Sequence, residues 1–172
     1  MKISIALVCT LMVGAVFVGP AVAQEGRPAP VAEVALGTFV FPDDSVVRET
    51  FAGGTVRFHL SPRLSVGPEV AYVQGRHHNH LMVSGNVTFD FLGPVAGREP
   101  AVTPFVTAGG GIFSSRESAP FLSGQTFNEG AFTAGGGVRG RIGERMYVGG
   151  EARFGWEPHL RVNAFVGVRL GA

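Results

Sequence analysis

Three histidines within four residues are the first candidates for chemistry in this chain. The run His77-His78-Asn79-His80 could bind a transition metal, because neutral imidazole is the commonest protein ligand for such ions. No cysteine or nearby carboxylate completes a set of ligands around His77, His78 and His80. We therefore expect a hydrated polar loop, without a bound metal.

Two further patterns touch on catalysis. Hydrolysis would need a serine, a histidine and an acid that converge, and Ser84, His80 and Glu69 are candidates that no particular spacing singles out. The run from Gly135 to Gly140 matches the dinucleotide-binding fingerprint, but no βαβ unit surrounds it. The sequence therefore predicts a protein that is not an enzyme and that carries no cofactor.

A larger set of charged residues falls on one face of the strands predicted below. A charge buried without a partner costs several kcal/mol, and the planar guanidinium of arginine pairs well with carboxylates. We expect a structural network in which Glu151 and Arg153 meet Arg139 or Arg141; an ion-lined pore is the alternative. The full set is Glu33, Arg57, Glu69, Asp90, Arg139, Arg141, Glu151, Arg153, Arg161 and Arg169.

The elements that must position these side chains are strands. Apolar residues alternate with small or polar residues at a period of two, which indicates strands, and no segment after residue 30 has a helical period. The runs are long enough to cross a bilayer as tilted strands, which takes about 9–11 residues. We predict eight of them: Val31–Phe41, Thr50–Leu60, Leu64–Gly75, His80–Leu92, Val102–Phe113, Glu129–Ile142, Met146–Trp156 and His159–Leu170.

The connections alternate between two kinds. Ser61–Arg63 and Gly143–Arg145 are tight turns, whereas the intervening set includes the polar loops Pro42–Glu49, Arg76–Asn79 and Ser114–Asn128. Short turns at one end and longer loops at the other are typical of bacterial transmembrane barrels. We therefore predict an all-β, eight-stranded antiparallel up-and-down barrel with a polar interior filled by side chains.

The position of the aromatic residues predicts which strand face meets lipid. With the tight turns on the periplasmic side, one aromatic belt forms near the turns and a second near the loops, as on a lipid-facing surface. A soluble periplasmic barrel that binds a small apolar ligand would have the opposite orientation, with its apolar face inside. The belt residues are Phe58, Tyr72, Phe89, Phe91, Phe132, Phe154 and Trp156.

Composition and the first residues agree with export to a membrane. Only 16% of residues are charged, against roughly 25% in an average domain. Fourteen basic residues nearly balance 13 acidic ones, which argues against nucleic-acid binding. Residues 1–23 have the pattern of a secretory signal, with Lys2 before an apolar run and Ala21-Val22-Ala23 at the cleavage site. We expect a flexible leader over residues 24–30 and the barrel over residues 31–172.

The chain resembles the small outer-membrane β-barrel proteins of Gram-negative bacteria, of the outer membrane protein A and X type. The resemblance covers the signal and nearly all of Val31–Leu170, and is carried by Gly53–Phe58, Leu60–Leu64 and Thr103–Gly111. It implies insertion into the outer membrane by the assembly machinery for such barrels. We expect a monomeric, non-enzymatic protein that contacts outer-membrane lipid and meets extracellular partners through its loops; a small pore or passive transporter is the alternative.

Overall fold

The computed structural model describes residues 28–42, 46–75, 78–93, 100–117, 126–156 and 159–171. The predicted signal and residues 24–27 of the predicted leader lie outside these ranges. No helix in them is long and apolar enough to cross a membrane.

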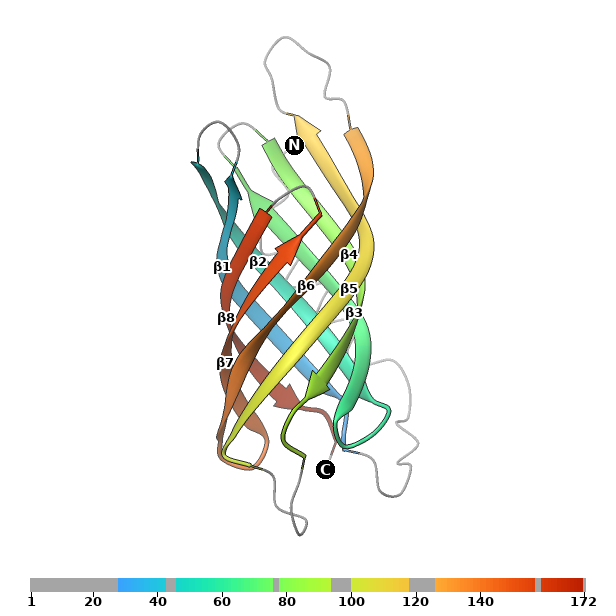
Figure 1. Cartoon of the computed structure of the whole chain (residues 1–172), viewed down its shortest axis with the longest axis vertical. Coiled ribbons are helices and arrows are strands. Elements are labelled where there is room, and N and C mark those ends of the chain that lie inside the picture. Colours follow the sequence, from blue (N-terminus) through green and yellow to red (C-terminus); the bar gives the residue numbers. More distant parts are fainter. Residues whose placement is uncertain are drawn as a thin grey trace.

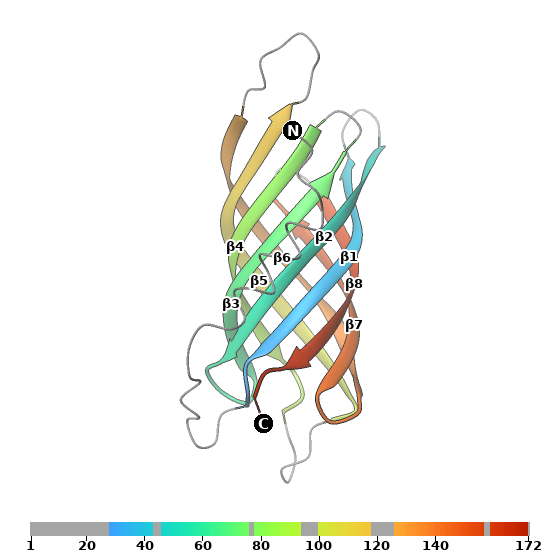
Figure 2. The same cartoon turned by 180° about the vertical axis from the view of Figure 1, so that it is seen from behind.

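Eight antiparallel strands form one closed barrel in chain order (Figures 1 and 2). The predicted fold class is therefore confirmed. The barrel closes where β1 pairs with β8, from Val31 opposite Arg169 to Val40 opposite Leu160. The strands are β1 (Val31–Pro42), β2 (Val46–His59), β3 (Leu64–Gln74), β4 (His78–Asp90), β5 (Val102–Glu117), β6 (Thr126–Ile142), β7 (Met146–Gly155) and β8 (His159–Arg169).

The strand ends differ from the prediction mainly at the loop end. Strand β2 begins four residues earlier than expected, β5 ends four residues later, and β6 begins three residues earlier. Much of the predicted loops Pro42–Glu49 and Ser114–Asn128 is therefore strand. The ladder continues through polar residues, with Arg116 opposite Thr126, because backbone pairing does not require an apolar side chain.

The two predicted tight turns lie together at the other end of the barrel (Figure 1). In the β6–β7 turn, Gly143 has a φ of 85°, a conformation that glycine adopts without a steric penalty. In the β2–β3 turn, the backbone N–H groups of Arg63 and Leu64 both donate to the hydroxyl oxygen of Ser61. We call this the turn end and the opposite end the loop end.

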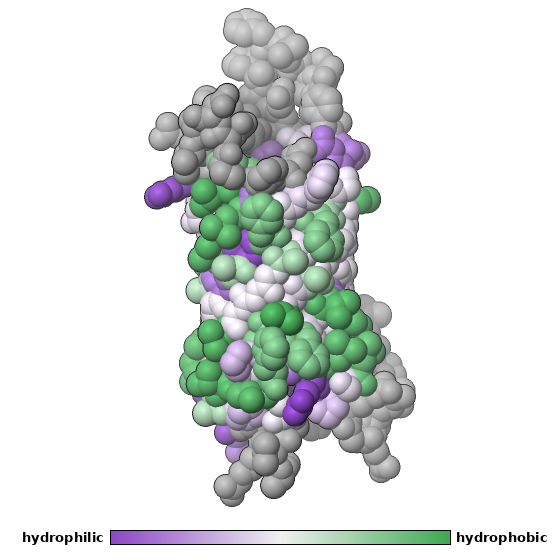
Figure 3. All heavy atoms as spheres, in the orientation of Figure 1, coloured by the Kyte–Doolittle hydropathy of each residue, from purple (hydrophilic) through white to green (hydrophobic). Residues whose placement is uncertain are grey.

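The outer surface is apolar. Burial alternates residue by residue along β7 and β8, and the exposed positions carry valine, leucine, alanine and aromatic side chains. Hydrophobic side chains gather in two bands with paler residues between them (Figure 3). The large exposed ones include Val34, Leu36, Val83, Val106, Ile112, Val138, Ile142, Met146, Val162 and Val166.

The predicted belt residues all lie on this outer surface. Phe58, Phe89 and Phe91 are exposed near the turn end, and the rings of Phe89 and Phe91 meet edge to face at 5.7 Å. Toward the loop end, Trp156 donates its backbone N–H to the carbonyl of Phe132, and the side chain of Phe154 points outward. Tyr72 is half-buried. The outward apolar face contradicts the soluble-barrel alternative, which requires that face to line the interior.

The interior is arranged in layers along the barrel axis. Near the loop end, an apolar cluster is formed by Phe39, Phe51, Ala71, Val73 and Met82. A second cluster nearer the turn end is formed by Val31, Phe105, Tyr147 and Phe165. Charged side chains lie between and beyond these two clusters.

Candidate functional site: the charged interior

Two glutamates and two arginines form what we call the central cluster. Arg153 Nη1 lies 2.9 Å from Glu69 Oε2, and its Nε lies 2.6 Å from Glu151 Oε1. Arg161 also contacts both carboxylates, through Nη1 to Glu69 and through Nη2 to Glu151 at 2.9 Å. Each arginine thus bridges both acids, and all four side chains are buried.

Two asparagines complete the hydrogen bonding of this cluster. Asn86 donates from Nδ2 to Glu69 Oε2 at 2.7 Å and accepts at Oδ1 from Arg153. Asn163 donates from Nδ2 to Glu151 Oε1 at 3.3 Å. Buried carboxylates need several donors, and these amides add one to each glutamate.

The cluster is braced across the lumen, because its members come from four strands. Glu69 is on β3, Asn86 on β4, Glu151 and Arg153 on β7, and Arg161 on β8. The guanidinium carbon of Arg161 lies 4.8 Å from the centre of the Phe51 ring. Through this cation–π contact the central cluster packs against the apolar cluster near the loop end.

Glycine on the neighbouring strand makes room for these side chains. A Cβ at Gly135 would lie 2.1 Å from the carbonyl oxygen of Ala152 and 2.6 Å from the Cα of Arg153. On β5, a Cβ at Gly109 would lie 1.9 Å from Oδ1 of Asn86. The two mid-strand glycine runs therefore permit close approach of the backbone to the central cluster.

A second set, the turn-end cluster, adjoins the apolar cluster nearer the turn end, because Tyr147 belongs to both. Arg57 Nη2 lies 2.5 Å from Glu33 Oε1 and donates to Tyr147 Oη at 2.7 Å, while Tyr147 donates to the same Glu33 oxygen at 2.5 Å. Arg139 Nη2 lies 3.0 Å from Asp90 Oδ1. The guanidinium carbon of Arg139 lies 4.4 Å from the centre of the Phe105 ring.

The predicted partners of Glu151 and Arg153 differ from the observed ones. Arg139 pairs with Asp90 in the turn-end cluster, and Arg141 is exposed at the barrel mouth. The partners are instead Glu69, which lies across the lumen on β3, and Arg161, which lies on the other neighbouring strand, β8. Arg169 is half-buried at the turn end of β8.

The predicted interior set omits several side chains that the structure places there, among them Glu49, Asn86, Tyr147, His159 and Asn163. Alternation along the strands puts the last four on the polar face, and that signal is sufficient to find them. Glu49 was assigned to a loop, but it lies inside the barrel with Oε2 3.6 Å from Nε2 of His80.

The candidate metal and catalytic residues have other surroundings. His77 and the side chain of His78 lie outside the described residues. His80 is buried, with its ring stacked 4.8 Å from that of Phe113, and the described residues contain no group of three metal-ligating side chains. Glu69 and Ser84 lie opposite each other on β3 and β4 and both accept from Nδ2 of Asn86, at 2.7 and 3.4 Å, whereas His80 lies 3.6 Å from Glu49.

Comparison with known proteins supports the fold. None of the known family models matches the chain, and neither does any curated protein. The N-terminal β-barrel domain of Pseudomonas aeruginosa OprF superposes with a TM-score of 0.66 at 14% identity, over 84% of this chain and 99% of that one. Neisserial surface protein A superposes with a TM-score of 0.67 at 10% identity, over 85% and 98%.

The outer membrane enzyme PagL is a more distant neighbour. It superposes with a TM-score of 0.50 at 15% identity, over 81% of this chain and 99% of that one. At such identities the similarity establishes the fold and carries no activity with it. The chain therefore has the fold of the small eight-stranded outer-membrane β-barrels.

Proposed function

We propose that this protein is an integral outer-membrane barrel with a structural or surface-interaction role and no enzymatic activity. The observation that carries the proposal is the inverted polarity of the barrel: large hydrophobic side chains cover its outside, while buried ion pairs cross its inside. Lipid is the solvent that suits such an outer surface. The fold neighbours, which are outer-membrane barrels, support the same location.

The packed interior favours this role over that of a pore. Eight strands enclose a space that side chains can fill, and here the central cluster braces it between two apolar layers. Arg161 is among the most deeply buried side chains of the chain. Conduction would require these contacts to break, and leaving a charge unpaired in such a place costs several kcal/mol.

The loop end is the part that we assign to extracellular partners. Barrels of this class carry short turns on the periplasmic side and longer connections outside the cell. We propose a monomer that the outer-membrane assembly machinery inserts.

Cell fractionation and gel mobility test the location. We expect the protein in the outer-membrane fraction after a carbonate wash, with a gel mobility that shifts on boiling, because closed barrels resist detergent until heated. Release by carbonate would contradict the proposal. As a matched pair, Ala164→Arg at mid-strand should destabilise the barrel in vesicles by about 2–4 kcal/mol, and Ile142→Arg at the strand end by about 0–1 kcal/mol.

Planar-bilayer recording tests the closed interior. We expect no reproducible single-channel steps from the refolded protein, because the central cluster blocks the lumen. Reproducible steps would support the pore instead. Glu69→Gln provides a comparison, since it removes a carboxylate that holds both central arginines.

A further inference from the structure

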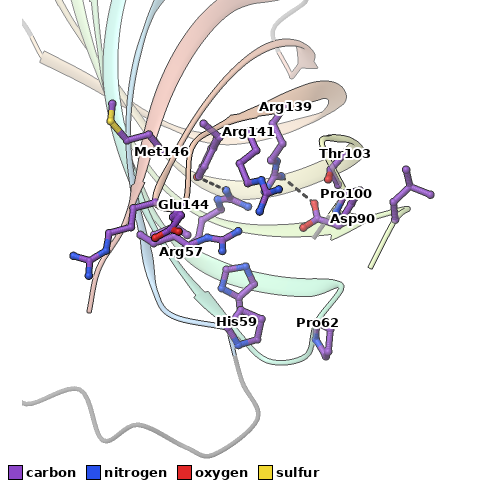
Figure 4. A pocket seen from close by; sticks show the side chains of 16 residues that line it. Arg57, His59, Pro62, Asp90, Pro100, Thr103, Arg139, Arg141, Glu144 and Met146 are labelled. Carbon is purple, nitrogen blue, oxygen red and sulfur yellow. Dashed lines mark hydrogen bonds and ion pairs between the residues drawn. The ribbon is translucent and has the colours of Figure 1, made fainter. Parts of the chain in front are cut away.

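A cavity of about 60 Å³ opens at the turn end, below the turn-end cluster (Figure 4). One water needs about 10–15 Å³ of such space, so the cavity has room for a small polyatomic group. Its lining is strongly basic and contains the side chains of Arg57, Arg139, Arg141, Arg145 and Arg169.

The carboxylates around the cavity do not balance these arginines. Glu33 pairs with Arg57 and Asp90 pairs with Arg139. Glu144 is the remaining acid of the lining. Among the described residues, five arginines therefore face three carboxylates, and His59 adds a ring at the mouth, so the described lining has a surplus of positive charge.

Two of the arginines at the rim have no internal partner. Within the described part of the chain, Arg141 and Arg145 make no ion pair, and both are exposed. Figure 4 shows Arg141 beside Arg139, which is joined to Asp90. The guanidinium of Arg141 is thus available to a group that enters from outside.

The inner wall of the cavity is held in place before any ligand arrives. Tyr147 and Glu33 hold Arg57, and the Phe105 ring supports Arg139. In the described structure the Nε–H groups of Arg57 and Arg139 are buried without an acceptor. Because this inner wall is already held in place, it loses little conformational entropy when an anion binds.

We propose that this cavity binds a phosphate oxyanion. The guanidinium group presents paired N–H donors that match phosphate oxygens, and arginines from several directions can serve a tetrahedral anion at once. Free phosphate and the phosphate of a phospholipid headgroup share this chemistry. The site belongs to the turn end of the barrel, so it depends on the fold and not on the proposed cellular role.

A phosphate titration of the refolded full barrel tests the site. The protein is held in maltoside micelles, which contain no phosphate, and backbone amide NMR shifts are followed as inorganic phosphate replaces chloride at constant ionic strength. We expect saturable shifts at residues 143–147 and at Thr103. In the double variant Arg141→Gln/Arg145→Gln, the Kd should rise at least tenfold.

The matched control removes the same charge elsewhere. Arg48 and Arg63 are exposed and lie outside the cavity lining, so Arg48→Gln/Arg63→Gln should leave the Kd within twofold of the wild-type value. An equal loss in both double variants would overturn the proposal, because it would indicate a general effect of charge. The absence of saturable shifts in the wild type would overturn it as well.

Nanodiscs distinguish the two sources of phosphate. In phosphate-free buffer, phosphatidylglycerol nanodiscs are compared with maltoside micelles. If the same amides shift in the nanodiscs, and only with Arg141 and Arg145 present, the ligand is a lipid headgroup. If the nanodiscs do not shift them and inorganic phosphate alone titrates the site, the ligand is soluble; both results support an oxyanion site. Failure of the carbonate or gel tests above would leave this result intact.

Discussion

The central cluster and the turn-end cluster are built from the same residue types but differ in their balance of charge. In the centre two arginines bridge two glutamates, with side chains at most 7% exposed. At the turn end Glu33 is 14% exposed, Asp90 and Arg139 are each 11% exposed, and Arg141 and Arg145 at the mouth make no ion pair with any described residue.

This difference shows how depth constrains composition. In the middle of the barrel an unpaired charge is costly, so the two arginines are matched there by two carboxylates that they share. At the mouth, water solvates a surplus guanidinium at little cost. The surplus arginines therefore lie at the mouth, where a ligand can reach them. The charge-balanced central cluster lies in the middle of the barrel, where it only holds strands together.

The largest effect should come from Glu69→Gln in the central cluster. It leaves Arg153 and Arg161 with one carboxylate between them, and breaking a buried pair costs about 3–5 kcal/mol. We expect that loss in the free energy of unfolding, measured by urea titration in phosphatidylcholine vesicles. Glu144→Gln in the exposed turn is the control and should stay within about 0.5 kcal/mol of the wild type.

Glu151→Gln tests the same cluster from its other acid. It should also weaken the barrel, because Glu151 contacts both arginines and Asn163. The measurement is resistance to unfolding by heat in detergent, scored by gel mobility. Unchanged heat resistance would mean that the central cluster does not stabilise the fold.

A smaller loss is expected for Asp90→Asn. Its ion pair with Arg139 is partly exposed, and the Phe105 ring continues to support the guanidinium. A hydrogen bond to a charged group contributes about 1.5–3 kcal/mol, so we expect a loss of about 2 kcal/mol in the same urea titration. A loss as large as that of Glu69→Gln would remove the distinction between the two clusters.

Tyr147→Phe should have a still smaller effect, of about 1 kcal/mol. The change removes the hydroxyl that links Arg57 to Glu33, but the direct ion pair between them remains. Urea titration of the variant and of Tyr72→Phe, whose side chain lies outside, would separate the hydroxyl's contribution from general effects. Equal losses in both variants would argue against a role for the Tyr147 hydroxyl.

The smallest effect on stability is expected for Arg141→Gln. The side chain is exposed and has no ion pair in the described structure, so the free energy of unfolding should change by less than about 0.5 kcal/mol. A stability loss comparable to that of Asp90→Asn would place Arg141 in the structural network. The assignment of surplus charge to the mouth would then be wrong.

The strands and the facing of their side chains could be predicted from the sequence because both are local properties. Alternation along His159–Arg169 separates the two faces of that strand, the aromatic residues indicate which face is outside, and the eight predicted segments all form strands. The ends were less predictable at the loop side, where polar residues such as Arg116 and Thr126 continue the backbone ladder.

The pairing of the interior charges could not be predicted in this way. Glu69 and Arg153 are far apart in the sequence and meet across the lumen, so their contact depends on barrel closure, strand tilt and register together. Arg141 shares the inward parity of Arg139 but lies at the mouth, since parity fixes the direction of a side chain and not its depth.

The contact between β1 and β8 has a consequence for the order of folding. Leu170 donates its backbone N–H to Pro30 at 2.7 Å, and the ladder above it joins the first strand to the last. Until β8 arrives, β1 presents a row of unpaired N–H and C=O groups, which hydrocarbon does not tolerate. A chain in which only the first seven strands have formed is therefore not stable in the bilayer. Insertion into the membrane and closure of the barrel must then be one event, which begins only after synthesis of β8.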